Sequence, residues 1–205
     1  MIELKNTSVM NFENAFRGAR NPMNSWERSD SYIDEKMNFV IGEQDLNLAQ
    51  KLCKAGSDDR KFLRQIFVCV DITAPLYWWK EYDTYKVATV ANSTSTMHKI
   101  HSKPFCIDDF SCDKMSAPTK EKMLNLIQYL ESLRISFTET KEKSYWYDII
   151  QLLPSSYNQL RTCTLNYETL VNIYHARKNH KLTEWHLFCD WIQSLPYAKE
   201  LITDF

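Results

Sequence analysis

The amino-acid sequence predicts an α+β fold in a single domain, and three observations support this prediction. Segments with the three- to four-residue apolar spacing of helices alternate with a few short apolar runs typical of strands. The chain has 205 residues, 44% hydrophobic and 25% charged, so it can bury a core without disulfides or metals. Only 3 glycines are present, which disfavours an all-β protein with many tight hairpins.

The N-terminal part is expected to contain one helix and one buried strand. Residues 1–31 are polar and rich in asparagine, so we expect an irregular N-terminal arm around a short first strand. Apolar residues at helical spacing predict a helix over 43–55, which Gly56 would end. Residues 62–73 are apolar at most positions, which predicts a strand covered on both faces.

The rest of the chain is expected to be mostly helical. Thr73 can cap the next helix, and Pro75 suits its first turn, where a missing N–H needs no partner. Residues 92–114 show no periodicity and are expected to be irregular. Apolar spacing and capping residues predict the remaining elements: helices over 116–133, 144–153, 167–178 and 182–194, and a strand over 157–165.

Composition excludes several classes of function. The net charge is −1, so the chain as a whole has no drive toward nucleic acid or an anionic membrane, and neither is expected as a partner. The glycine-rich phosphate motifs GxGxxG and GxxxxGK[ST] are absent. The 6 cysteines are scattered without a CxxC pair, and no signal peptide or membrane-length apolar run is present. We therefore expect reduced thiols and a cytoplasmic location.

Residues 72–97 are the most informative segment of the chain. A buried strand leads through Thr-Ala-Pro into an aromatic helix and then into a loop rich in Ser, Thr and Asn that contains Lys86. Hydroxyl groups and one cation after a strand–helix unit can bind phosphate. The alternative is a solvated loop whose hydroxyls bond to its own backbone. Arg20, between Gly18 and Pro22, is a further candidate, with a simple turn as its alternative.

Residues 98–112 contain the best set of possible metal ligands. The segment HKIHSKPFCIDDFSC offers five candidate ligands, but their spacing fits no standard zinc motif. They are His98, His101, Cys106, Asp108 and Cys112. We therefore expect no metal site. No Ser-His-Asp or Cys-His arrangement can be argued from these residues, so no catalytic residue is assigned.

Two segments of the chain resemble those of the flavin-dependent thymidylate synthase family, the ThyX type. In the first, the strand IFVCVDIT leads into Ala-Pro and aromatic residues, and seven residues separate residues 84–86 from Thr94. This is the spacing of the family signature R-H-R, seven residues, S. In the second, over 152–185, a Leu-Pro and a tyrosine-bearing strand precede Asn166, with Arg177 eleven residues later. Eleven residues is close to three helical turns, so both side chains would share one helix face.

The resemblance implies a twisted β-sheet flanked by long helices, assembled as a homotetramer with active sites at subunit junctions. Members of the family bind FAD, dUMP, a folate methylene donor and NADPH, and the flavin passes a hydride during the methylation of dUMP. The chain is therefore identified as a divergent member, expected to be a flavoprotein that binds a dUMP-like nucleotide and to have methyltransferase activity.

Site residues follow from the resemblance position by position. The expected FAD-binding residues are Thr84, Tyr85 and Lys86, beside the phosphates, and Asn166, at the flavin. The expected dUMP-binding residues are Glu81, Thr94, Ser95, Thr96 and Arg177.

The chain departs from the family pattern at several charged positions. Thr84 and Tyr85 replace the Arg and His of the signature, and Glu81 replaces a Gln. Thr96 stands where an Arg clamps the dUMP phosphate, and Glu168 stands where an Arg follows the flavin-contacting Asn. Each lost Arg removes a charged, two-pronged contact to an anion. The alternative function is therefore a non-catalytic nucleotide-binding protein, or an assembly protein, on the same scaffold.

Overall fold

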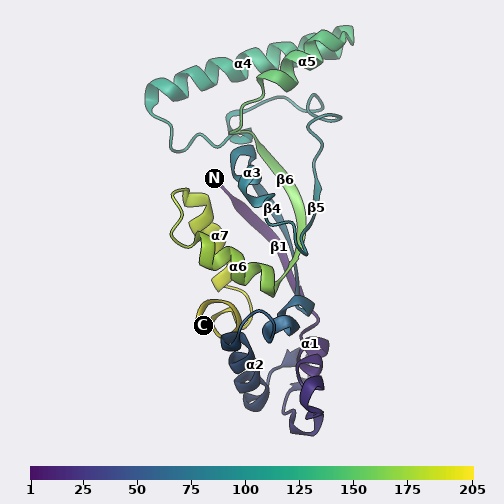
Figure 1. The fold of residues 1–205 in the computed structure, drawn as a ribbon. Helices are drawn as coiled ribbons and strands as arrows, with labels where there is room; N and C mark the ends of the chain where they lie inside the picture. The colour runs from purple at the N-terminus through teal and green to yellow at the C-terminus, as the bar shows by residue number, and fades with distance from the viewer. The chain divides into compact units, whose positions relative to one another are not determined.

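The computed structural model describes residues 1–205 and confirms the α+β class, with 51% of residues in helices and 18% in strands. The main sheet is antiparallel, with the strand order β1-β4-β6-β5 (Figure 1). Its strands are β1 (Glu3–Met10), β4 (Phe67–Pro75), β5 (Val90–Ser93) and β6 (Asn158–Asn166). A separate antiparallel hairpin pairs β2 (Tyr32–Ile33) with β3 (Phe39–Val40).

Seven α-helices accompany the strands. They are α1 (Phe12–Ala19), α2 (Glu43–Ala55), α3 (Leu76–Tyr82), α4 (Ala117–Thr140), α5 (Lys143–Leu152), α6 (Tyr167–Arg177) and α7 (Thr183–Gln193). Short 3₁₀ turns occur at Asn21–Met23, Trp26–Arg28, Arg60–Gln65 and Ile107–Asp109, and a π turn spans Lys199–Thr203. None of the helices combines the length and the hydropathy that crossing a membrane requires.

The chain folds into two compact units, each built from several segments. Unit 1 contains residues 1–3, 72–84 and 92–162. Unit 2 contains residues 4–71, 85–91 and 163–205. All four strands of the main sheet contribute residues to both units.

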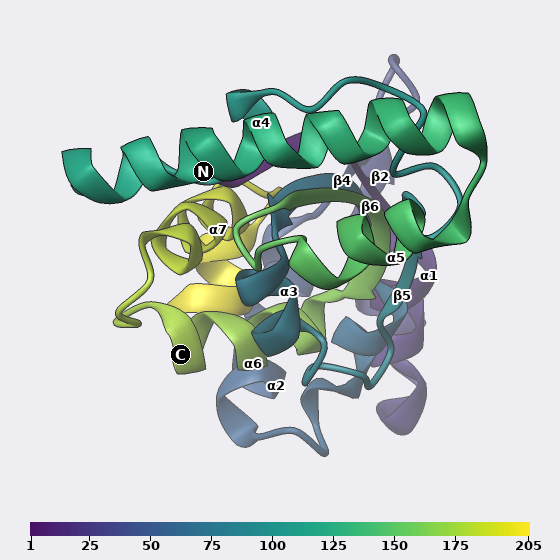
Figure 2. The same ribbon diagram turned by 90° about the horizontal axis from the view of Figure 1, so that it is seen from above.

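Helices α4 and α5 form the principal core of unit 1, and they lie side by side in Figure 2. Helix α4 buries one face, whose residues are Met123, Ile127, Leu130 and Leu133. Ile149 of α5 is fully buried against this face. The helix was predicted to end at residue 133, but it continues to Thr140, where Lys141 adopts a positive φ of 60°. The apolar periodicity is lost after residue 133, and the prediction, which depended on that periodicity, therefore ended the helix too early.

Strand β4 begins later than predicted. Val68, Val70 and Ile72 are fully buried, while the residues between them are exposed or half-buried, so the strand is covered mainly on one face. The prediction of a strand from residue 62 was wrong, because residues 60–65 form a 3₁₀ turn. Phe62 and Leu63 are both buried in that turn. A short apolar run does not distinguish a buried turn from a strand.

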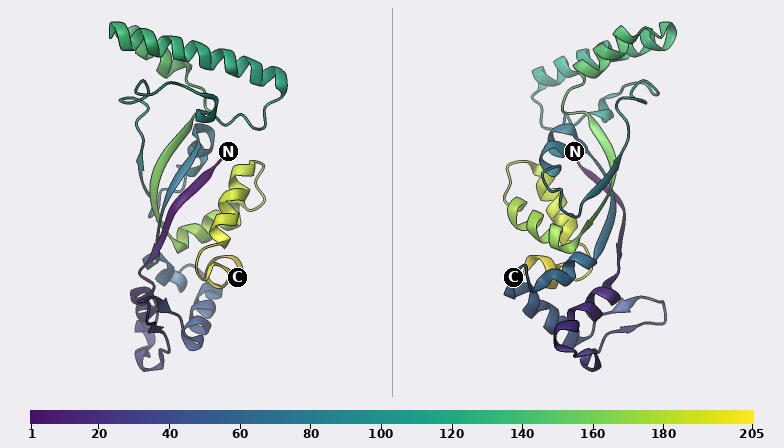
Figure 3. Two further views of the ribbon diagram at one scale, coloured as in Figure 1. Left: turned by 180° about the vertical axis from the view of Figure 1, so that it is seen from behind. Right: turned by 45° about the vertical axis from the view of Figure 1, so that its right-hand side comes forward.

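In unit 2, the C-terminal helices and the π turn pack together, as the green to yellow segments of Figure 3 show. The N-terminal segment, expected to be an irregular arm, contains a strand of eight residues and helix α1. Ala15 and Phe16 bury one side of α1. The Phe16 ring meets the ring of Phe62 edge-on, with centroids 5.7 Å apart, so α1 packs on the 3₁₀ turn at residues 60–65.

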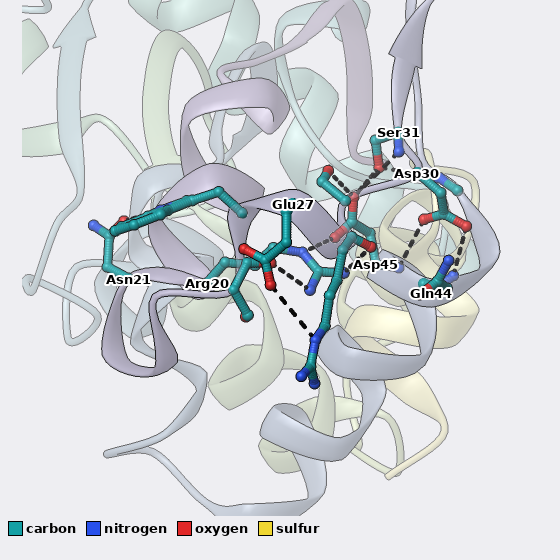
Figure 4. A network of polar contacts seen from close by, with 12 residues as sticks. Arg20, Asn21, Glu27, Asp30, Ser31, Gln44 and Asp45 are labelled. Atoms are coloured by element: carbon teal, nitrogen blue, oxygen red, sulfur yellow. Dashed lines mark hydrogen bonds and ion pairs between the residues drawn. The ribbon is translucent and has the colours of Figure 1, made fainter.

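A buried ion pair holds the loop after α1 against helix α2. The Arg20 Nε donates to Asp45 Oδ1 at 2.5 Å, and the two side chains are 5% and 1% exposed. The remaining Arg20 donors reach the carbonyl oxygens of Ser25 and Arg28 at 3.2 and 3.0 Å. Figure 4 shows how this network converges on Asp45. Arg20, a candidate for binding an anion, therefore has a structural role.

The second oxygen of Asp45 accepts hydrogen bonds from the hydroxyls of Ser29 and Ser31 at 2.6 and 2.5 Å. Burial by itself would raise the pKa of the Asp45 carboxyl. The hydrogen bonds from Ser29, Ser31 and Arg20, with the Arg20 charge, outweigh burial and lower the pKa below its usual value. A carboxylate in this setting contributes to stability only while it is ionised.

We predict that Asp45→Asn destabilises the protein by about 3–5 kcal/mol, because it leaves Arg20 buried without its counter-charge. The parent protein should keep the Asp45 contribution above a pH of about 3.9, the ordinary Asp pKa, and lose it as the pH falls through the lower folded pKa. Urea unfolding between neutral and acid pH measures both effects. Glu43→Gln, an exposed change on the same helix, is the control. An Asp45→Asn protein as stable as this control would contradict the prediction.

Candidate functional site

The nine residues expected to bind FAD or dUMP divide between the two units. Unit 1 contains Glu81, Thr84, Thr94, Ser95 and Thr96. Unit 2 contains Tyr85, Lys86, Asn166 and Arg177. Two separate arrangements follow, one in each unit.

In unit 1, Thr94, Ser95 and Thr96 line one cavity of about 370 Å³. Ligand pockets in proteins typically measure about 300–1,000 Å³, so the cavity has room for a small molecule. Its other walls come from the first residues of β6, from the 3₁₀ turn at residues 107–109 and from residues 99–105. Three residues that the resemblance assigns to dUMP thus line one cavity.

Strand β6 holds the first of these residues in place. The Thr94 N–H donates to the Leu160 carbonyl at 2.9 Å, and its hydroxyl donates to the same oxygen at 3.3 Å. The Gln159 amide donates to the Thr94 carbonyl at 2.7 Å. The Gln159 carbonyl in turn accepts from the buried Trp79 indole at 3.0 Å. The N–H, hydroxyl and carbonyl of Thr94 are therefore all hydrogen-bonded to β6, which fixes the position of the loop.

Ser95 begins a turn that carries the next two polar side chains of the cavity. Its hydroxyl accepts the His98 N–H at 2.9 Å, and its carbonyl accepts the Lys99 N–H at 3.3 Å. The Ser95 side chain thus caps the turn, which is the local role that serines often have. The half-buried Thr96 hydroxyl makes no hydrogen bond within the chain, so it can bond to a ligand.

The cavity lining carries two lysines and two aspartates, so its formal charge is zero. Lys103 is paired with Asp109, which also accepts the Cys106 N–H at 2.9 Å. Burial would raise the pKa of Asp109, but the hydrogen bond from Lys103 and that backbone N–H lower it. The same pair raises the pKa of Lys103. Lys99 and Asp108 form no ion pair and remain available to a ligand.

Sequence reasoning missed several residues of this cavity. Lys99 follows Ser95 by four positions, and this helical spacing was the signal that could have identified it. Tyr157 precedes strand β6 and Asn158 opens it, and both lie in the second segment of the resemblance. The Asn158 side chain is already engaged, because its oxygen accepts the Ser111 hydroxyl at 2.8 Å.

The other two predicted residues of unit 1 lie at the end of α3. The Thr84 hydroxyl and N–H both donate to the Glu81 carbonyl, at 2.7 and 3.1 Å. The hydroxyl and N–H of Thr84 therefore end the helix, although the family signature predicts a phosphate contact at this position. Beside it, Arg161 pairs with Asp83 at 2.7 Å and covers the Trp79 ring at 4.1 Å.

In unit 2, Tyr85 and Arg177 are in direct contact. The Arg177 Nε donates to the Tyr85 hydroxyl at 2.7 Å. The guanidinium also lies 4.7 Å from the ring centroid of the buried Trp185. A cation stacked on an indole is stabilised by the ring quadrupole, so Arg177 is held in one orientation. Its spacing from Asn166 was noted in the sequence, but its Tyr85 contact joins residues 92 positions apart.

Residues 86–89 form a turn that could take an anion. The Thr89 N–H donates to the Lys86 carbonyl at 3.5 Å, and Thr169 binds the Val87 carbonyl at 3.1 Å. Lys86 is exposed and forms no ion pair. The Thr89 hydroxyl is buried without a hydrogen-bond partner. The turn therefore carries one exposed cation and one buried hydroxyl without a partner.

Asn166 joins strand β6 to helix α6. Its side-chain oxygen accepts the Thr169 N–H at 2.9 Å and the Thr169 hydroxyl at 3.1 Å, which caps the helix. Its amide nitrogen donates to the Arg64 carbonyl at 3.2 Å. The residue is only 3% exposed. Its flavin contact stays a prediction, and one amide hydrogen remains for it.

The charge reversal at Glu168 is compensated inside unit 2. Glu168 accepts a hydrogen bond from the Arg60 Nε at 2.9 Å, and its side chain is 10% exposed. Arg60 also lies 5.4 Å from the ring centroid of Phe205. The carboxylate is therefore neutralised by a neighbouring cation rather than left to repel a bound anion.

The structure contains no group of three or more His, Cys, Asp or Glu side chains that could hold a metal ion. Within residues 98–112, the Cys106 thiol contacts Asp109 at 3.4 Å, and the His101 ring packs 4.8 Å from that of Phe137.

Comparison with solved structures shows which proteins share this fold. The ThyX flavin-dependent thymidylate synthase of Helicobacter pylori, in complex with FAD and dUMP, superimposes with a TM-score of 0.71, 17% identity and 98% coverage of each chain. A second structure of this enzyme with FAD and dUMP gives 0.70, with 16% identity and coverage of 100% and 98%. The UMP/dUMP methylase PolB of Streptomyces cacaoi, bound to 5-Br dUMP, gives 0.61, with 14% identity and coverage of 100% and 95%.

The sequence matches no protein-family model and no curated protein. The likeness to the three structures therefore concerns the fold, which runs along nearly the whole chain. The ThyX-like fold expected from the two sequence segments is confirmed.

We predict that Asn166→Ala destabilises the protein by about 1–2 kcal/mol, because α6 loses its cap and the Arg64 carbonyl loses a donor. Asn166→Ser keeps a cap oxygen and should recover most of the loss. Chemical denaturation of the parent and the two variants measures the differences. Equal stability of Asn166→Ala and the parent would show that the cap is unimportant.

Proposed function

We propose that this chain is a divergent thymidylate-synthase-like protein that binds a dUMP-like nucleotide in the unit 1 cavity, and FAD through unit 2 residues. The observation that carries the proposal is the cavity itself. Three residues that the resemblance assigns to dUMP, Thr94, Ser95 and Thr96, line one pocket in a chain with the ThyX fold. The solved structures with this fold hold dUMP or a dUMP analogue.

The chemistry of the cavity suits a nucleotide. A nucleoside monophosphate is anionic at one end and carries a hydroxyl and a neutral base at the other. The cavity offers Lys99 for an anion, Asp108 as a hydrogen-bond acceptor for a hydroxyl, and the Thr96 hydroxyl for either. The lining has zero formal charge but carries separate positive and negative groups. It therefore suits a nucleotide, which has a charged end and a neutral end, better than it suits a simple anion.

FAD is proposed on the residues that open the Tyr85–Ala91 segment. Lys86 and Thr89 would hold a phosphate, because the one is an unpaired cation and the other a buried hydroxyl without a partner. Tyr85, fixed by Arg177, would border the same ligand. When bound, FAD supplies hydride transfer, which is the chemistry that methylation of dUMP needs.

A specific observation also favours the non-catalytic alternative. Thr84 closes α3 with its own hydroxyl, and the carboxylate of Glu168 is committed to Arg60. Neither residue supplies the cation that the family pattern has at its position. A chain with fewer cations binds anions less tightly, so nucleotide binding without methyl transfer remains the second proposal.

Purified protein should be yellow or should take up added FAD, and calorimetry should detect heat on addition of dUMP. We predict that Lys86→Gln weakens FAD binding by roughly 10- to 100-fold, since it removes a charged hydrogen bond worth about 1.5–3 kcal/mol. The same variant should leave dUMP binding unchanged. Colourless protein that ignores FAD but binds dUMP would leave only the non-catalytic proposal. Protein that ignores both ligands would refute both proposals.

We also propose a homo-oligomer, with the tetramer of the resemblance as the expected state. In unit 1, Leu124 and Ile135 of α4 are 43% and 44% exposed. They stand eleven residues apart, close to three turns, so they lie on one face of the helix. A second copy could cover these two apolar side chains.

Light scattering of the parent protein should give a mass of about four times the 24.3 kDa chain. The double variant Leu124→Glu, Ile135→Glu should have a lower mass, because association would bury two unpaired charges and burying them costs free energy. Lys122→Glu, an exposed change on the same helix, is the control and should keep the parent mass. A monomeric parent would exclude the assembly.

A further inference from the structure

We propose that Lys99 is the phosphate-binding cation of the unit 1 cavity, in place of the arginine that the chain lacks at Thr96. The inference rests on the proposed function, because it assumes that a nucleoside monophosphate enters this cavity. Lys99 lies outside the family signature, so the resemblance assigns it no role. The ligand class is a phosphate monoester attached to a nucleoside.

The turn that begins at Ser95 brings Lys99 to the cavity. The Ser95 carbonyl accepts the Lys99 N–H at 3.3 Å, and the Ser95 hydroxyl accepts the His98 N–H at 2.9 Å. These two bonds close one helical turn over residues 95–99. Residues three and four apart on such a turn are neighbours on its surface, so Thr96 and Lys99 lie on the same side. Both line the cavity.

The second lysine of the cavity cannot replace Lys99 without loss. Lys103 is paired with Asp109, and Asp109 also binds the Cys106 N–H at the start of the 3₁₀ turn. Moving Lys103 to a phosphate would leave Asp109, whose side chain is only 10% exposed, without its counter-charge. Lys99 has no such commitment, because it forms no ion pair. It is therefore the cation that is free to meet an anion in this cavity.

Two neighbouring residues, Ser102 and Thr96, also favour phosphate binding at Lys99. The Ser102 hydroxyl donates to the Lys99 carbonyl at 2.7 Å, which fixes the backbone on the far side of the turn. Thr96, with its hydroxyl uncommitted, offers a donor beside the cation. A lysine acts as a point charge, whereas an arginine binds with a planar fork. Replacement of an arginine by Lys99 thus keeps the attraction but gives up the two-pronged geometry.

The test compares a nucleotide with its nucleoside. The probes are dUMP and deoxyuridine, which differ only by the phosphate, followed by ligand-observed NMR titration because this method reports weak as well as tight binding. The variants are Lys99→Gln, Lys99→Arg and the matched control Lys122→Gln, an exposed lysine of α4 outside the cavity. Circular dichroism melting confirms that each variant is folded.

Lys99→Gln should weaken dUMP binding by roughly 10- to 100-fold, the range for loss of one charged hydrogen bond, and leave deoxyuridine unchanged. Lys99→Arg should retain dUMP binding, and Lys122→Gln should match the parent. If the parent binds dUMP and Lys99→Gln binds it equally well, the inference is overturned while the proposed function stands. An equal loss for dUMP and deoxyuridine also overturns it. A parent protein that ignores dUMP overturns the proposed function itself.

Discussion

The hydrogen bonds of Asn166 are the constraint on which unit 2 depends. One side chain ends strand β6, caps helix α6 through Thr169 and holds the Arg64 carbonyl. Because the cap sets where α6 begins, it also sets where Arg177 emerges eleven residues later to meet Tyr85. A side chain that is 3% exposed and satisfied by three hydrogen bonds stabilises the fold first, and any contact with a cofactor is additional.

In the unit 1 loop, too, a polar side chain can either hydrogen-bond to the backbone or remain available to a ligand. Thr94 and Ser95 were expected to bind a substrate, with a self-satisfied loop as the alternative. These two hydroxyls bond to backbone groups, as the alternative expects, while Thr96 and Lys99 keep their polar groups available in the cavity. Short-range bonds form a rigid turn, and the turn then presents the free groups.

Positions that are basic in the family pattern have a different surrounding in each unit. In unit 2, the acidic Glu168 is paired with Arg60, so a position that is basic in the family pattern becomes part of a structural ion pair. In unit 1, Thr84 uses its hydroxyl to close α3, and a lysine stands one turn beyond Thr94–Thr96. The fold is shared with the ThyX structure at 17% identity.

Local pattern was sufficient for the α+β class, the bounds of α2, and the positions of α5, α6 and α7, because these depend on periodicity and capping within a few residues. Two spaced segments were sufficient for the ThyX-like fold. The 3₁₀ turn at residues 60–65, the Arg20–Asp45 pair and the Tyr85–Arg177 contact emerged only in three dimensions. Lys99 became a candidate in the same way. In each case the partner lies far along the chain or in a cavity wall, and sequence spacing carries no information about which distant group will satisfy a buried charge or hydroxyl.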